Sequence, residues 1–397
     1  MKQACFSVIL LCYKHFEYLY SAIDSVLSQD YPNIELIISD DGSKDFPEEQ
    51  LRVYVDAHKD SNLTNLVIRQ EPHNVGTVRH LNHAVAACSG AYIAALAGDD
   101  NFNDSHVLSA YVAGFSRAPE TCYIEMAQTA MYNEIMDTLE DFYLKPPVQA
   151  ALEKTETDTT ELLKLLIQFG PCLPSTSTCF KRDFFEKFGD FDETYTLVED
   201  YPMHIRLAEE GWIIHYESFV AIKHRHGGIS HGQSGASAAS SVLYYTDLQR
   251  MTEDLVLSHL DVLDEDNRKK VARQKAKELQ WIAFHLARVQ KNYSKMFFLA
   301  ASHPLHSFFV LLTHLNGWAV KWHVNMLYIC MGLWFATPWI AQMFELVTPY
   351  SAELAASVLC VLGGCTFFLW VCAFLIWGAN RIYRAILRFP SETLVVG

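Results

Sequence analysis

Two pairs of adjacent carboxylates are the residues in this sequence best suited to chemistry. Asp40-Asp41 follows the apolar run 34–39, and Asp99-Asp100 follows the apolar run 91–97. Neighbouring carboxylates repel each other, and a bound cation relieves that cost. Oxygen ligands of this kind suit Mg²⁺ or Mn²⁺. One such pair is equally well explained as a turn, because Asp and Gly are common turn formers. Two pairs at neighbouring strand ends indicate a divalent-cation site.

A third acidic pair, Glu199-Asp200, stands just before the predicted helix 202–210. Acids are favoured at a helix N-terminus because they complement the helix dipole, so this pair has a purely structural explanation as well. Taken alone, the pair is explained by the helix that follows it.

Alternating strands and helices must position these acids. Continuous apolar runs predict buried parallel strands, and the runs lie at 7–12, 34–39, 66–69 and 91–97. Amphipathic stretches predict the intervening helices, at 18–28, 50–58 and 80–89, the last ended by Gly90 as a C-cap. Ligands of such sheets bind beyond the carboxyl ends of the strands. Both strand-end acidic pairs fall there.

The composition excludes several classes of protein. Hydrophobic residues make up 50% of the chain and charged residues 19%, which excludes disorder and collagen-like repeats. Lys and Arg number 31 against 46 Asp and Glu, a net charge of −15, which excludes nucleic-acid binding through a basic face. The ten cysteines form no CxxC pair, so no zinc site is predicted. An acidic protein that handles phosphorylated substrates needs a local cation.

Six motifs occur in one order across roughly residues 5–232. They are SVILLCYK, DDGSKD, NVGTVRHLNHA, GAYIAALAGDD, GDFDETYTLVEDYPMHIRLAEEGW and HGGIS. In order and spacing they resemble the family 2 glycosyltransferases with the GT-A fold. The resemblance implies an α/β, Rossmann-like, mostly parallel sheet with flanking helices. It also implies an enzyme that transfers a hexosyl or N-acetylhexosaminyl group from a nucleotide sugar, expected to be a UDP-sugar.

The resemblance implies roles for the residues at the strand ends. Tyr13 would stack on the nucleotide base, with a buried core aromatic as the alternative. Asp41 would accept a hydrogen bond from the base, with Asp40 beside it. Asp100 would bind the metal that bridges the diphosphate, and Asp99 would assist with the ribose or the metal. The metal expected is Mn²⁺ or Mg²⁺.

The later motifs add the remaining predicted site residues. Asp200, beside Glu199, would be the catalytic base of an inverting transfer. His226 would complete the metal or phosphate site, and His224 and His231 are the alternatives.

Arg79 is the last candidate for donor binding. It would meet the base or the phosphate, although a solvated helix charge explains it equally well.

The C-terminal quarter differs from the rest. No Lys or Arg lies between Lys321 and Arg381, and the uncharged stretches 324–344 and 354–378 are long enough to predict two transmembrane helices. The basic flanks place the catalytic domain in the cytoplasm, by the positive-inside rule. The predicted protein is therefore a multi-pass protein of the inner (plasma) membrane.

Four regions are predicted along the chain. They are a GT-A nucleotide-sugar domain (1–240), an amphipathic helical region (241–302), an interfacial helix on membrane lipid (303–323), and a transmembrane hairpin with a basic cytosolic tail (324–397).

The QxxRW motif of processive synthases is absent from the sequence. The prediction is therefore transfer of a single sugar to a lipid-linked saccharide acceptor, in surface polysaccharide assembly. Two alternatives stay open: direct transfer to polyprenyl phosphate, and a non-catalytic nucleotide-sugar-binding subunit of a synthase complex. The sequence does not predict the oligomeric state.

Overall fold

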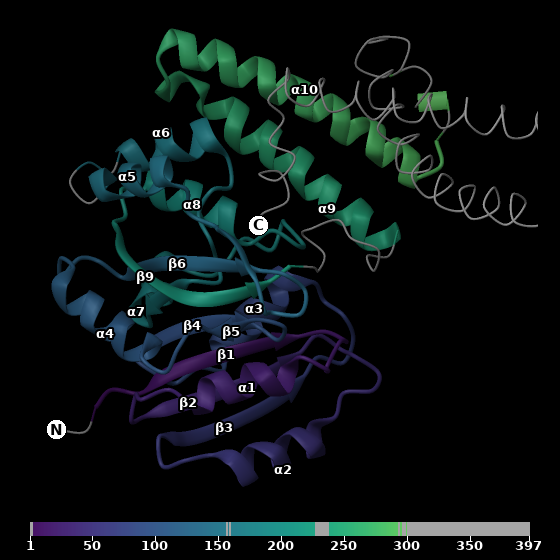
Figure 1. The fold of residues 1–397 in the computed structure, drawn as a ribbon. Coiled ribbons are helices and arrows are strands. Elements are labelled where there is room, and N and C mark those ends of the chain that lie inside the picture. The colour runs from purple at the N-terminus through teal and green to yellow at the C-terminus, as the bar shows by residue number, and fades with distance from the viewer. Residues whose placement is uncertain are drawn as a thin grey trace, which may run out of the picture. The chain divides into compact units, whose positions relative to one another are not determined.

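The computed structural model describes residues 3–292 except 156, 157, 159 and 227–237, and in addition residues 294, 295 and 299. Within this part of the chain, the residues up to Gln290 belong to one compact unit (Figure 1). The four domain boundaries predicted from the sequence stay predictions.

One nine-stranded sheet organises the described residues, with the order β3-β2-β1-β4-β8-β6-β9-β5 and with β7 paired to β6. Strands β1, β2, β3, β4, β6 and β9 run in one direction, and β5, β7 and β8 run against them. The strands are β1 (Phe6–Cys12), β2 (Ile34–Asp40), β3 (Leu63–Gln70), β4 (Tyr92–Ala97), β5 (Asn101–Phe102), β6 (Ile124–Tyr132), β7 (Leu139–Phe142), β8 (Thr178–Lys181) and β9 (Ile214–Arg225). The predicted α/β class with a mostly parallel sheet is confirmed.

Helices cover both faces of the sheet, because side chains of each strand alternate between two cores. Val8 and Leu10 of β1 pack with α1 (Leu19–Leu27), α2 (Glu48–His58) and α4 (Val107–Arg117). Ile9 points to the opposite face and packs with the second set of helices. That set contains the C-terminal helices described below and, before them, α3 (Thr77–Ala86), α5 (Pro146–Thr155), α6 (Thr160–Phe169), α7 (Asp183–Phe188) and α8 (Asp200–Glu209). The apolar runs of β1 and β2 are continuous for this reason.

The predicted C-cap at Gly90 is wrong. Helix α3 ends at Ala86, and Ala87 is its C-cap. A Cβ atom at Gly90 would lie 2.6 Å from the backbone nitrogen of Ser7. Glycine is therefore required at position 90 because the chain passes close to β1, and it does not end the helix.

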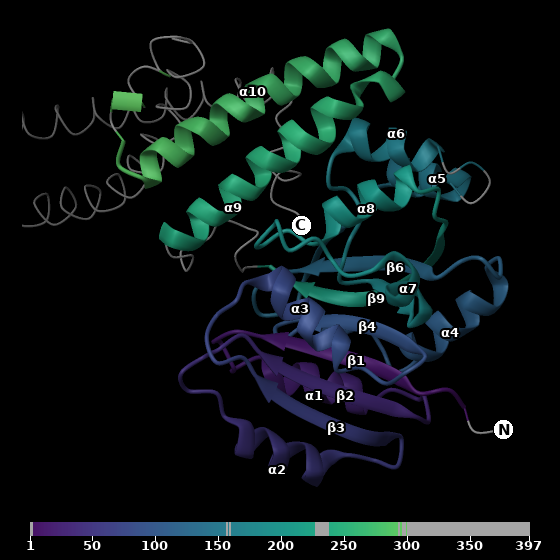
Figure 2. The same cartoon turned by 180° about the vertical axis from the view of Figure 1, so that it is seen from behind.

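The C-terminal part of the compact unit is helical. Helix α9 (Ala238–Arg250) leads through a π-helical turn (Met251–Val256) and a 3₁₀ turn (Leu257–Val262) into α10 (Glu265–Val289). Asp264 caps α10 by accepting hydrogen bonds from the backbone of Asp266 and Asn267. Helices α9 and α10 lie side by side, on the side of the sheet that carries α6 and α8 (Figures 1 and 2).

The predicted multi-pass membrane localisation is wrong for the part of the chain that the structure describes. No helix there is both long and apolar enough to cross a membrane. Helix α10 has 25 residues, but it is rich in charged side chains such as Lys269 and Arg273. The predicted spans 324–344 and 354–378 and the predicted interfacial helix 303–323 lie outside the described residues.

Candidate donor and catalytic sites

The carboxyl ends of β1, β2 and β4 meet at one edge of the sheet. The backbone N–H of Asp41, after β2, donates to the Cys12 carbonyl at 3.0 Å. The backbone N–H of Gly98, after β4, donates to the Leu11 carbonyl at 2.8 Å. The strand-end site, as we call this edge, is formed by Tyr13, Asp40, Asp41, Asp99 and Asp100.

Asp40 is fully buried and stabilises the turn that follows β2. Its Oδ1 accepts a hydrogen bond from the Ser43 hydroxyl at 2.6 Å. Its Oδ2 accepts hydrogen bonds from the Ser43 backbone N–H at 2.6 Å and from Gln70 Nε2 at 3.0 Å. These contacts match the turn-forming explanation of the DDGS motif, and they leave Asp41 as the acid that reaches beyond the turn.

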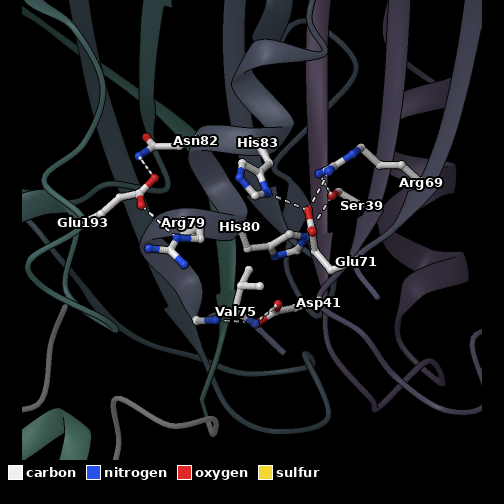
Figure 3. A network of polar contacts seen from close by, with 11 residues as sticks. Ser39, Asp41, Arg69, Glu71, Val75, Arg79, His80, Asn82, His83 and Glu193 are labelled. Atoms are coloured by element: carbon white, nitrogen blue, oxygen red, sulfur yellow. Dashed lines mark hydrogen bonds and ion pairs between the residues drawn. The ribbon is translucent and has the colours of Figure 1, made fainter. Parts of the chain in front are cut away.

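Asp41 holds the loop 74–76 that precedes α3. Its Oδ1 accepts from the Val75 backbone N–H at 2.8 Å (Figure 3). Its Oδ2 accepts from Asn74 Nδ2 at 2.8 Å and from the Gly76 backbone N–H at 3.2 Å. Burial raises the pKa of this carboxyl above its ordinary value. Asp41 therefore fixes the loop that borders the strand-end site.

Tyr13 stands at the end of β1 with 38% of its surface exposed, so it is not a buried core aromatic. Lys14 Nζ lies 4.6 Å from the centroid of its ring. Lys14 and His15 adopt φ values of 56° and 50°. Such positive values are uncommon outside glycine, and they turn the chain sharply after the strand. The turn leaves the Tyr13 ring accessible to a flat ligand.

Asp100 is fully buried, and both of its carboxylate oxygens have partners. Oδ2 lies 2.8 Å from His224 Nδ1, and Oδ1 accepts from the Arg225 backbone N–H at 2.9 Å. Asp99 is partly buried, and burial together with the Asp100 charge raises its pKa to about 6.

The histidine in contact with the strand-end acids is His224. Burial alone would lower its pKa, but the charge of Asp100 and the hydrogen bond to it leave the pKa raised above the ordinary value. His226 instead lies with its Nδ1 3.5 Å from Glu140 Oε2. The structure thus places His224, one of the predicted alternatives, beside Asp100. His226, the residue predicted first, lies at the β6–β7 hairpin. His231 lies outside the described residues.

Sequence reasoning missed Arg225, the last residue of β9. Its Nε donates to the Asp99 carbonyl at 3.0 Å, and its guanidinium lies 3.9 Å from the centroid of the Tyr18 ring. The side chain is buried in spite of its charge. A buried arginine needs acceptors of this kind, and the basic cluster KHRH at positions 223–226 was the available sequence signal.

The strand-end donors fit a divalent cation by their chemistry. Burial first, and then the charge of Asp100, raise the pKa of Asp99, and a cation beside the pair would neutralise that charge. Carboxylate oxygens suit Mg²⁺ or Mn²⁺. Among the residues that the structure describes, no group of three or more His, Cys, Asp or Glu side chains is arranged around one metal position.

Asp200, the first residue of α8, is 2% exposed. Its Oδ1 accepts from the Tyr201 backbone N–H at 2.7 Å. Its Oδ2 is buried and has no hydrogen-bond partner within the described residues. Burial raises the pKa of Asp200 to about 6. An unpartnered buried oxygen with this pKa is able to take up a proton near neutral pH.

The surroundings of Asp200 come from distant parts of the chain. Burial first, and then the Asp200 charge, raise the pKa of Glu199 to about 7, and the nearby Ser175 side chain lowers it. Burial first, and then the Asp200 charge, raise the pKa values of Tyr143 and Tyr244. The acidic pair therefore lies among the segment after β7, the loop before β8, and α9.

Arg79 is engaged on the protein surface and does not reach the strand-end acids through any hydrogen bond of the described residues. Its Nε donates to Glu193 Oε2 at 2.8 Å, and Asn82 Nδ2 donates to Glu193 Oε1 at 3.2 Å (Figure 3). About half of the Arg79 side chain is exposed. The contact links α3 to the segment that leads to Glu199-Asp200.

A family model matches the part of the chain that contains this edge. Residues 7–172, less than half of the 397 residues, match the model described as Glycosyl transferase family 2. This part of the chain is similar to that family. The match includes the strand-end acids, and Glu199, Asp200 and His224 lie beyond it.

Curated relatives agree with the domain match. An uncharacterised glycosyltransferase of Rickettsia felis is 24% identical over 270 residues, which are 64% of this chain and 40% of that protein. An uncharacterised glycosyltransferase of Rickettsia typhi is 27% identical over 219 residues, 55% of this chain and 63% of that protein. The chain thus spans less than two thirds of the length of either relative. The matches support the predicted enzyme class, a glycosyltransferase.

A solved structure also resembles the chain. The mannosyltransferase PcManGT of Pyrobaculum calidifontis, in complex with GDP-Man and Mn²⁺, is 16% identical and has a TM-score of 0.46, over 78% of this chain and 84% of that one. The α/β fold of the described residues rests on their own sheet order and strand directions.

Proposed function

We propose that the protein transfers a single sugar from a nucleotide sugar to an acceptor hydroxyl with inversion, assisted by a divalent cation. The observation that carries this proposal is the buried, unpartnered Oδ2 of Asp200, with a pKa raised to about 6 by burial. A general base works best when its pKa lies near the operating pH. The match to the family 2 model supplies the class of reaction.

The donor occupies the strand-end site in this proposal. The exposed Tyr13 ring stacks on the base. The Asp41 carboxylate accepts a further hydrogen bond from the base. Asp99 and Asp100 would hold the cation, with Asp100 oriented by His224. A bound Mg²⁺ or Mn²⁺ would neutralise charge that develops on the leaving diphosphate.

The chemical step is one displacement. Asp200 Oδ2 takes the proton of the acceptor hydroxyl while the hydroxyl oxygen attacks the anomeric carbon. The bond from that carbon to the diphosphate oxygen breaks, and the nucleoside diphosphate leaves with the electron pair. Attack opposite the leaving group inverts the configuration. The proton rests on Asp200 and then passes to solvent.

The acceptor stays a prediction. A lipid-linked saccharide was predicted from apolar C-terminal segments that lie outside the described residues. The effect of the Ser175 side chain on the Glu199 carboxyl supports the loop 171–178 as part of the acceptor wall, since it requires this loop to lie near the acidic pair. The Asp200 charge felt by Tyr143 and Tyr244 supports the same location.

A thermal-shift screen of nucleotide sugars with and without Mn²⁺ tests the proposal, followed by transfer assays with the stabilising donor. We expect one donor class to raise the melting temperature only with the cation, and a donor at 100 times its Kd to add about 2.7 kcal/mol of stability. The stabilising donor should then release nucleoside diphosphate when a saccharide acceptor is present. Donor binding without any release would favour the non-catalytic alternative. A product carrying one sugar on phosphate, labile to mild acid, would favour polyprenyl phosphate as the acceptor.

A further inference from the structure

Asp247 on α9 reaches back to the segment before the acidic pair. Its side chain is 4% exposed. Its Oδ2 accepts hydrogen bonds from the backbone N–H groups of Thr196 at 2.8 Å and of Leu197 at 2.7 Å. Residues 194–198, here called the pre-catalytic segment, lead directly into Glu199-Asp200. A single carboxylate oxygen thus satisfies two backbone donors of this segment.

A second residue of α9 holds the same segment. Arg250 Nη1 donates to the Thr194 carbonyl at 2.6 Å, and its guanidinium lies 5.7 Å from the centroid of the Tyr195 ring. Asp247 and Arg250 are three positions apart, so they lie on one face of the helix. Helix α9 therefore holds the pre-catalytic segment at two backbone N–H groups, through Asp247, and at one carbonyl, through Arg250.

The other side of the pre-catalytic segment touches the loop that Asp41 fixes. The Val78 backbone N–H donates to the Thr196 carbonyl at 3.3 Å. Gly76 has a φ of 90°, and a Cβ atom there would lie 2.7 Å from Thr196 Cγ2. Gly76 itself donates to Asp41 Oδ2 (the same loop contacts Asp41 through Val75 in Figure 3). Direct contacts therefore run from Asp41 through the loop 74–76 and Thr196 to Asp247.

We infer that Asp247 is a positioning residue for glycosyl transfer, whose carboxylate fixes the pre-catalytic segment and so places Asp200 relative to the donor. The inference rests on the proposed function, since it takes Asp200 as the base. The assignment lies outside the part of the chain that matches the family model, which ends at residue 172.

The chemistry of the contact fits positioning better than simple attachment of a helix. An apolar side chain would attach α9 without the cost of burying a carboxylate, because that cost is repaid only by hydrogen bonds. Two adjacent backbone N–H groups need acceptors when they are shielded from water. A carboxylate satisfies both of them with one oxygen, and it fixes the direction of the backbone just before α8.

The test compares Asp247→Ala and Asp247→Asn with Asp261→Ala, an exposed acid outside the pre-catalytic contacts. We expect Asp247→Ala to lower kcat by about 10- to 100-fold, the scale of a small misplacement of a catalytic group. Donor KM should change less than kcat, because the contacts of Asp247 reach Asp41 only indirectly, through Thr196 and the loop 74–76. Asp247→Asn should recover part of kcat, since its amide oxygen still accepts both hydrogen bonds. Asp261→Ala should match the wild type.

Hydrogen exchange at the Thr196 and Leu197 amides gives a readout that does not depend on activity. We expect faster exchange at these two amides in Asp247→Ala, with smaller changes in Asp247→Asn. Wild-type kcat in Asp247→Ala, or a loss of kcat that Asp247→Asn does not relieve, would overturn the inference. If Asp247→Ala does not fold, Asp247→Asn carries the test: faster exchange at the two amides together with wild-type kcat would also overturn it.

Asp200→Asn in the same assay separates this inference from the proposed function. If Asp200→Asn turns over normally, the proposed base is wrong, whatever Asp247 does. If Asp200→Asn is inactive and Asp247→Ala is normal, only the positioning role of Asp247 fails.

Discussion

The two acidic regions of the molecule differ in how their carboxylates are satisfied. At the strand-end site, Asp41 accepts three hydrogen bonds, and both oxygens of Asp100 have partners. At the start of α8, Asp200 accepts one hydrogen bond from Tyr201, and its Oδ2 has none among the described residues.

This difference indicates two roles, ligand binding at the strand-end site and proton transfer at Asp200. A carboxylate whose two oxygens both accept hydrogen bonds is fixed in place by them. A buried carboxylate with a free oxygen has a raised pKa and a site at which a proton can be accepted. The strand-end acids therefore suit the binding of a donor and a cation, and Asp200 suits the chemical step.

Removing an acid from the strand-end site should have a large effect. We expect Asp100→Ala to lower transfer by about 10²- to 10³-fold, the scale of losing one electrostatic contact to a developing charge. EDTA should abolish transfer by the wild type, and added Mn²⁺ or Mg²⁺ should restore it but should not rescue Asp100→Ala. Initial rates with and without EDTA measure this effect. Full activity in EDTA would show that transfer does not need a cation. The strand-end site would then be a donor site alone.

The pH dependence of the rate should report the acidic pair at α8. Burial raises the pKa of Asp200 to about 6, and burial together with the Asp200 charge raises that of Glu199 to about 7. The base must be unprotonated, so kcat/KM should fall as the pH drops below these values, by about tenfold per unit where a single proton is involved. Rates from about pH 5 to about pH 8, with donor binding measured at each pH, test this expectation. A rate that rises toward low pH would contradict it.

The two histidines near the strand-end site offer a matched pair of variants. His224 lies 2.8 Å from Asp100 Oδ2, and His226 lies 3.5 Å from Glu140. Losing a residue that orients a metal ligand usually costs about 10- to 100-fold in metal affinity or activity, and we expect this of His224→Ala. His226→Ala should stay near wild type. Titration with Mn²⁺ compares the two variants, and the reverse order would show that His226 is the residue that acts at the cation.

A buried acid outside both acidic regions should affect stability and leave activity unchanged. Glu125 on β6 is fully buried, and neither of its oxygens has a hydrogen-bond partner in the part of the chain described. Burial, and then the charge of Glu217, raise its pKa from 4.5 to about 9. The folded protein keeps a proton that the unfolded chain releases, so this group lowers stability as the pH rises from about 4.5 to about 9, by at most about 1.4 kcal/mol per pH unit.

Glu125→Gln removes this titration. We therefore expect the stability of Glu125→Gln relative to wild type to increase with pH, while transfer is unchanged. Urea unfolding at two pH values measures the difference. A constant difference between the two proteins would mean that Glu125 is ionised in the folded state.

The first half of the sheet could be predicted from the sequence because its signals are local. The apolar runs of β1 and β2 and the acids that follow them lie within a few residues of each other. The choice between His224 and His226 could not be predicted in this way. It depends on the antiparallel pairing of Asn101 with Lys223, which brings β9 beside the turn after β4.

The residues that sequence reasoning missed act across long separations. Arg225 reaches the carbonyl of Asp99 from β9, and Asp247 reaches Thr196 from a helix that was predicted only as amphipathic. A charged residue on an amphipathic helix has the same sequence pattern whether it faces solvent or a buried backbone. Only the packing of α9 against the pre-catalytic segment, within the compact unit, distinguishes the two cases.

The most direct test of the central claim is a side-by-side measurement of transfer and donor affinity in Asp200→Asn. The asparagine keeps the shape of the side chain and the oxygen that accepts from Tyr201, but it cannot take up the acceptor proton. We predict that transfer falls by at least about 10²-fold, within the range that general bases contribute, while donor Kd stays unchanged. Transfer at the wild-type rate would contradict the claim that Asp200 is the base, and a parallel loss of donor affinity would place Asp200 in donor binding instead.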